Sequence, residues 1–181
     1  RYIDNEASLE MFRDSQRRLK AMALIHEKLY QSDNMERIDF GKYVENLLNH
    51  LYVSYCLNKD RISLNTNIDE CFIGIDTAVP CGLVINEIVS NSLKHAFNKA
   101  DAQGSINVEL KLQQDATFAL TISDTGSGIT PGTDLQNAQT LGLRLVNALV
   151  LDQLEGSIQC ETNPGTMFRI KFGEVKYSKR A

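Results

Sequence analysis

Residues 86–95 read NEIVSNSLKH, and residues 124–129 read DTGSGI. The first stretch lies in a predicted helix, where Glu87 and Asn91 share one face because they are four residues apart. The second stretch follows an apolar strand pattern and places Asp124 before a glycine turn. An acid for an adenine amine, an amide oxygen for magnesium and glycines beside phosphates together predict a nucleotide site.

Further polar groups follow the two stretches. Lys94 and His95 come one turn after Asn91, within reach of phosphate oxygens. A helix predicted to start near Leu141 offers free backbone amides to anions, and Gly142 lets a phosphate approach closely. Thr166 is a candidate hydroxyl near the adenine.

Each piece also has an ordinary structural interpretation. Glu-x-x-x-Asn is common on helices whose polar stripe only faces water, and residues 124–128 fit a simple chain reversal as well as a binding loop. Residues 140–146 (TLGLRLV) fit an ordinary amphipathic helix start, and Gly165-Thr166 indicates nothing by itself. The order and spacing of the four pieces favour the nucleotide site.

Composition limits the class of protein. With 181 residues and 43% hydrophobic content, the chain can build one good core with a small appendage. A net charge of −4 argues against a nucleic-acid surface, and no apolar stretch is long enough to span a bilayer. Four cysteines without a CxxC pair predict reduced, buried thiols, so we expect a cytoplasmic location.

Hydrophobic periodicity predicts an α+β fold, a mixed β-sheet covered on one face by helices. The loop at residues 125–139 is long enough to suggest a functional role. The predicted helices are 6–32, 40–57, Thr77 or Pro80 to about Phe97, and 141–154 ended by Gly156; the predicted strands are 61–68, 105–113, 117–123, 157–161 and 166–172.

The first helix has an apolar face too wide for a two-stranded seam, which suits a helix of a four-helix bundle. Residues 1–3 read as the last turn of a preceding helix, so the chain is expected to come from a longer protein. The predicted divisions are a remnant of a helical hairpin at 1–35, a nucleotide-binding domain at 36–175 and a tail at 176–181.

In this order the pieces resemble the ATP-binding domain shared by histidine kinases, type II topoisomerases and a heat-shock chaperone, the Bergerat fold. Residues 87–97 match its N box, 124–129 its first glycine box, 140–146 a reduced second glycine box and 165–166 its closing strand. Residues 1–4 and 15–30 resemble the second helix of the dimerisation and phosphotransfer hairpin in soluble sensor histidine kinases related to the HWE kinases.

The resemblance implies ATP and Mg²⁺ as ligands. Asn91 would be the magnesium ligand, Glu87 the acid–base or polarising carboxylate, and Asp124 the acceptor for the adenine amine. The second glycine box has a single glycine, and no aromatic F box occurs between Ile129 and Thr140. Other implied nucleotide contacts are Lys94, His95, Gly126, Gly128, Ile129, Gly142, Leu143 and Thr166.

The resemblance also implies transfer of the ATP γ-phosphoryl group to a histidine upstream of Arg1, and then to an aspartate of a response regulator receiver domain. The chain's own or a partner's dimerisation helices would be further partners. His26 is expected to pack in the bundle, His50 to lie on a helix surface and His95 to belong to the nucleotide site. The chain is therefore expected to bind Mg-ATP without autophosphorylating.

Two other classes of function fit the same fold. One is an ATP-dependent serine protein kinase of the anti-sigma type or a conformational ATPase, against which the hairpin match argues. The other is an interaction domain with a decayed site, against which the intact Glu87, Asn91 and Asp124 argue.

Overall fold

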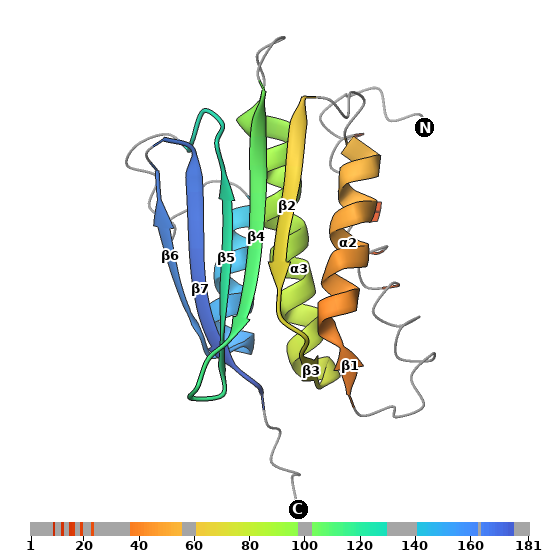
Figure 1. The fold of residues 1–181 in the computed structure, drawn as a ribbon, viewed down its shortest axis with the longest axis vertical. Coiled ribbons are helices and arrows are strands. Elements are labelled where there is room, and N and C mark those ends of the chain that lie inside the picture. The colour runs from red at the N-terminus through yellow and green to blue at the C-terminus, as the bar shows by residue number, and fades with distance from the viewer. Residues whose placement is uncertain are drawn as a thin grey trace, which may run out of the picture.

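The computed structural model describes residues 37–55, 61–97, 103–129, 141–162 and 164–175, together with Leu9, Phe12, Ser15, Gln16, Leu19 and Ala23. Helices α2 (Phe40–Tyr55), α3 (Ile75–Asn91) and α4 (Leu141–Ala148) cover one face of a five-stranded sheet (Figure 1). The sheet order is β2-β4-β5-β7-β6, formed by Ile62–Ile68, Gly104–Leu112, Thr117–Asp124, Thr166–Gly173 and Ser157–Glu161.

The sheet is mixed in direction. Strand β2 pairs in parallel with β4, and every other neighbouring pair is antiparallel. In this register the last residue of β5, Asp124, lies between Ile106 of β4 and Thr166 of β7. The predicted α+β class with a mixed sheet under one layer of helices is therefore confirmed.

One core lies between the sheet and the helices. Alternate residues of the three central strands are buried, as expected for a sheet with one covered face. Helix α3 is buried on most sides, which explains its nearly continuous apolar sequence. The sheet contributes Ile106, Val108, Leu110, Phe118, Leu120, Ile122, Phe168, Ile170 and Phe172; the helices contribute Leu47, Leu48, Leu51, Val84, Ile85, Ile88, Val146, Leu149 and Val150.

Several element ends differ from the sequence prediction. Helix α3 begins at Ile75, before Thr77, and Pro80 lies inside it. A two-stranded antiparallel sheet of β1 (Ile38–Asp39) and β3 (Phe72–Ile73) was not predicted, because two-residue strands have too few positions for an alternating pattern.

Helices α3 and α4 both run on into π-helical turns, which are η1 (Ser92–Ala96) after α3 and η2 (Leu149–Gln153) after α4. The helical stretch after α4 ends at Gln153, and its left-handed residue is Glu155 with a φ of 48°. Gly156 takes part in ending the helix, as predicted, because its amide donates to the carbonyl oxygen of Val150 at 2.8 Å, but Glu155 holds the left-handed position that glycine usually takes. Glycine is needed at 156 for another reason, since a Cβ there would lie 2.5 Å from the carbonyl oxygen of Lys171.

Other expectations concern residues outside the described part of the chain. The six described residues of the predicted first helix are helical, and Leu9, Phe12 and Leu19 among them are exposed. Residues 1–3, His26, the loop at 130–139, Thr140 and the tail at 176–181 lie outside the description, so the three domain divisions stay predictions. Within the described residues, no helix is both long and apolar enough to cross a bilayer.

The described cysteines are free thiols. Cys71 and Cys81 are buried and Cys160 is half-buried, while Cys56 lies outside the described residues. Burial raises the pKa of the Cys71 and Cys160 thiols to about 11 and raises that of Cys81 further. These thiols are therefore protonated and unreactive near neutral pH.

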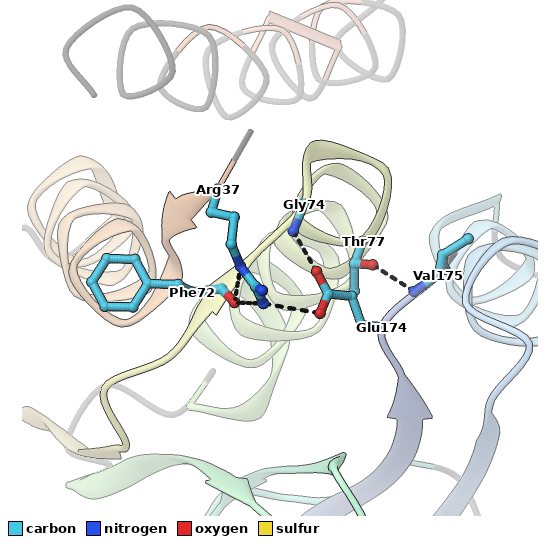
Figure 2. Close-up of polar contacts among 6 residues, drawn as sticks. All are labelled: Arg37, Phe72, Gly74, Thr77, Glu174 and Val175. Carbon is cyan, nitrogen blue, oxygen red and sulfur yellow. Dashed lines mark hydrogen bonds and ion pairs between the residues drawn. The ribbon is translucent and has the colours of Figure 1, made fainter. Parts of the chain in front are cut away.

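A polar cluster ties the start of α3 to β3, to the residue before β1 and to the segment that follows β7 (Figure 2). The Arg37 side chain donates to the carbonyl oxygen of Phe72 at 3.1 Å and to Glu174 at 3.0 Å. The other Glu174 oxygen accepts from the backbone amide of Gly74 at 3.0 Å, where α3 begins. Beside it, the Val175 amide donates to the Thr77 hydroxyl at 2.9 Å. A carboxylate at this helix end satisfies a free amide and complements the dipole.

Replacement of Glu174 by alanine is expected to lower the free energy of unfolding by about 1 kcal/mol, or about 2–4 °C in Tm. The bond to the Gly74 amide is partly shielded from water and accounts for most of this effect. The matched control is Glu161→Ala, which breaks only the exposed pair with Arg169 and should cost about 0.5 kcal/mol or less. Equal Tm shifts for the two variants in thermal denaturation would contradict the capping role.

Candidate nucleotide site

Glu87 and Asn91 both face the first turn of α4. A Cβ placed on Gly142 would lie 3.0 Å from Glu87 Oε2 and 3.6 Å from Asn91 Nδ2. The spacing of four residues thus puts the carboxylate and the carboxamide on one face, as the sequence predicts. Gly142 lets the start of α4 pack closely against both groups, because a larger side chain would press on the Glu87 carboxylate.

The Glu87 carboxylate is held in a buried setting. Its side chain is only 4% exposed, and its Oε1 accepts from the Asn86 amide at 3.2 Å. One turn further, the Ser90 hydroxyl donates to the Glu87 carbonyl oxygen at 3.1 Å. A buried carboxylate with a fixed orientation is suited to act on a group brought next to it.

Asp124 ends β5 with its side chain 6% exposed. Oδ2 accepts from the Ser92 hydroxyl at 2.8 Å, and Oδ1 accepts from the Gly126 amide at 3.0 Å. Each carboxylate oxygen can accept a second hydrogen bond. The acid is thus oriented by two donors and keeps capacity for the amine of a ligand.

The first glycine box packs tightly on its neighbours. Gly165 has a φ of 77°, and a Cβ there would lie 1.9 Å from the carbonyl oxygen of Asp124. Gly126 lies against Ala96, whose carbonyl oxygen accepts from the Ser127 amide at 2.9 Å. A Cβ on Gly128 would lie 3.0 Å from the carbonyl oxygen of Gly165. The turn after β5 is therefore held against both η1 and the start of β7.

The π turn η1 carries Lys94 and His95. The Lys94 ammonium lies over the ring of Tyr55, 5.8 Å from its centroid, and His95 is exposed. A π turn changes the direction of the side chains that follow it, and such turns are frequent at functional sites. The sequence predicted an ordinary helix here, since i→i+5 bonding leaves no mark on hydrophobic periodicity.

The remaining predicted contact residues lie near this region with different exposures. Thr166 is 6% exposed and pairs with Asp124 in the β5–β7 ladder. Ile129 is partly buried and packs against the core. Leu143 is buried in the core, so its side chain stabilises α4, and its backbone is the part available to a ligand.

The four sequence pieces therefore meet around the end of α3. Ser92 joins Asp124 to this end through its hydroxyl, and its neighbour Asn91 lies by Gly142. Three residues in this arrangement were not singled out from the sequence: Ser92, Asn86 and Tyr55. Ser92 sits within the N box and its small polar side chain on a buried helix was a usable signal. Nothing in the sequence links Tyr55 to Lys94.

The donor set fits a magnesium ion that depends on a nucleotide. Within the described residues no group of three His, Cys, Asp or Glu side chains is placed to hold a metal ion. Mg²⁺ commonly takes one or two protein oxygens and completes its shell with phosphates and water. The Asn91 side chain, which lies beside Glu87 and the start of α4, has an amide oxygen that suits that role.

Comparison with known families agrees with this arrangement. The family model of histidine kinase-, DNA gyrase B- and HSP90-like ATPases matches residues 77–176, which is more than half of the chain. A histidine kinase family model matches residues 1–55.

Two relatives of similar sequence are histidine kinases. The sensor histidine kinase PdtaS of Mycobacterium tuberculosis is 29% identical over 160 residues, covering 87% of this chain and 31% of the relative. The blue-light-activated histidine kinase 2 of Erythrobacter litoralis is 26% identical over 141 residues, covering 74% and 39%. The chain thus spans about a third of the curated relatives it matches.

Among solved structures, the histidine kinase domain of the Erythrobacter litoralis EL346 blue-light activated histidine kinase has the same fold. It superposes with a TM-score of 0.80 at 23% identity, covering 89% of this chain and 75% of that one. The chain therefore belongs to the family of histidine kinase-, DNA gyrase B- and HSP90-like ATPases, on its sensor histidine kinase branch.

Proposed function

We propose that this chain is the Mg-ATP-binding catalytic region of a two-component sensor histidine kinase. In the full-length protein, ATP would phosphorylate a histidine, and the phosphoryl group would pass to an aspartate of a response regulator receiver domain. Membership of the ATPase family supports ATP binding, and the histidine kinase match at residues 1–55 supports phosphotransfer to histidine.

Asp124 orients the adenine in this proposal. The carboxylate accepts the exocyclic amine while Ser92 and the Gly126 amide keep it in place. The neighbouring Thr166 hydroxyl lies one strand away, in register with Asp124. An adenine amine suits this acid because it supplies the donor that a buried carboxylate needs.

The phosphates extend towards Gly142 at the start of α4. The free amides of the first helical turn attract anions, and at Gly142 no side chain covers the backbone. Lys94, which is carried by η1, would bind the same phosphates through its ammonium group. When bound, Mg²⁺ neutralises phosphate charge, and Asn91 is the residue that would hold it.

Glu87 acts on the attacking group. The imidazole nitrogen forms a bond to the γ-phosphorus, the bond from that phosphorus to the bridging oxygen breaks, and ADP leaves with the electron pair. The imidazole proton passes to the Glu87 carboxylate, or is polarised by it. The observation that carries the proposal is the joint approach of Glu87 and Asn91 to Gly142.

Asn91→Ala is expected to abolish the magnesium dependence of ATP binding, because the amide oxygen that holds the metal is lost. ATP titrations with Mg²⁺ and with a chelator measure this dependence directly. The control is Asn65→Ala, which removes an amide from the open face of the sheet, where it donates to Asn107 at 2.8 Å. If Asn91→Ala keeps the full difference between the two titrations, Asn91 is not the ligand.

A further inference from the structure

Tyr55 is the last residue of α2, and the Lys94 side chain from η1 lies over its ring. The Lys94 ammonium is 5.8 Å from the centroid of the Tyr55 ring. This distance is within the range at which a lysine is attracted by the face of an aromatic ring. The proposed function gives roles to Asp124, Asn91 and Lys94 and none to Tyr55.

The surroundings give the ring a fixed place. Tyr55 is partly buried and packs against the hydrophobic core. One turn earlier, the Tyr52 hydroxyl donates to the carbonyl oxygen of Ile62 at 2.6 Å, which ties the end of α2 to the start of β2. Lys94 is therefore held next to a surface that belongs to the rigid scaffold.

An aromatic face differs from a carboxylate as a partner for lysine. An aromatic ring attracts the ammonium without neutralising its charge, and it does not accept hydrogen bonds from the N–H groups as strongly as a carboxylate does. The positive charge that attracts a phosphate is therefore kept. A carboxylate in the same place would compete with the phosphate for those donors.

We infer that Tyr55 is a positioning residue that holds the Lys94 ammonium, by its ring face, in the place where it binds the phosphates of ATP. This inference rests on the proposed function, because it needs a nucleotide whose phosphates lie near η1. The ring lowers the cost of ordering the long lysine side chain when the phosphates arrive. Adenine binding at Asp124 is independent of it.

The test compares the Kd of Mg-ATP with that of adenosine, which has the base and no phosphates. Tyr55→Leu is expected to raise the Kd of Mg-ATP about threefold to tenfold and leave that of adenosine unchanged. Tyr55→Phe keeps the ring and should match the unaltered protein. Tyr55→Met fills a similar volume without an aromatic face, so it serves the same purpose if the leucine variant does not fold.

A double-mutant cycle separates the ring–lysine pair from general damage. In a Lys94→Gln background, Tyr55→Leu should no longer change the Kd of Mg-ATP, because the cation it positions is gone. The matched control is Tyr52→Leu, which loses a tyrosine from the same end of α2 and should leave the ratio of the two Kd values unchanged.

Four results overturn the inference: an unchanged Kd of Mg-ATP in Tyr55→Leu, an equal loss of ATP and adenosine binding in that variant, the same effect of that substitution with and without Lys94, or tighter ATP binding once the ring is removed. The proposed function fails on different ground. It fails if the unaltered chain binds no Mg-ATP, whereas an intact ATP site with no response to Tyr55→Leu removes only the role of Tyr55.

Discussion

Glu87→Gln in the full-length protein is expected to slow autophosphorylation about 10²–10⁴-fold while ATP affinity stays nearly unchanged. The carboxylate is buried and held by Asn86, so the substitution keeps its shape and removes its capacity to take a proton. Gln is neutral and still hydrogen-bonds, which limits the damage to the chemical step. Transfer of labelled phosphate from ATP, followed in single-turnover conditions, measures that step.

The control for this variant is Glu109→Gln, which removes a carboxylate from the open face of the sheet. Glu109 accepts from Asn67 at 3.0 Å and lies away from the site residues, so its substitution should leave the rate unchanged. Equal rates for Glu87→Gln and the unaltered kinase would remove the acid–base role. Acid lability of the labelled product distinguishes phosphohistidine from the phosphoserine that a serine kinase of this fold would form.

Asp124→Asn is expected to weaken ATP binding roughly tenfold to a hundredfold, since a buried donor left without an acceptor costs about 1–3 kcal/mol. The carboxylate accepts from Ser92 and from the Gly126 amide and is proposed to accept the adenine amine as well. An asparagine amide must present its NH₂ group to one of these donors. Calorimetric titration with Mg-ATP gives the affinity.

The matched control is Asp115→Asn in the turn at the other end of β5. Asp115 is exposed and accepts from Thr117 and Lys171, so it orients a hairpin rather than a ligand. Thermal denaturation of both variants shows whether lost binding reflects lost folding. Undiminished affinity in a folded Asp124→Asn protein would place the adenine elsewhere.

Much of the fold could be predicted because its signals are local. The alternation of Ile106, Val108 and Leu110 marks a strand with one covered face, and β5 and β7 show the same pattern. The mainly apolar sequence of α3 likewise predicted deep burial. The short strands β1 and β3 escaped because they depend on a pairing across the chain.

The site shows the same division. The shared face of Glu87 and Asn91 follows from helix geometry, and Asp124 was placed within one residue of its observed position at the end of β5. What escaped are contacts between segments, such as Ser92 with Asp124 and Lys94 with Tyr55. These depend on the π turn η1 and on the packing of α2, which local patterns do not specify.

The most direct measurement is a calorimetric titration of the 181-residue chain with Mg-ATP, repeated with Mg-GTP. If Asp124 at the end of β5 and Asn91 at the end of α3 bind the same nucleotide, one ATP binds per chain and GTP binds much more weakly. Guanine offers a carbonyl oxygen where adenine has its amine, which a carboxylate repels. No saturable binding, or equal affinity for both nucleotides, would contradict the account.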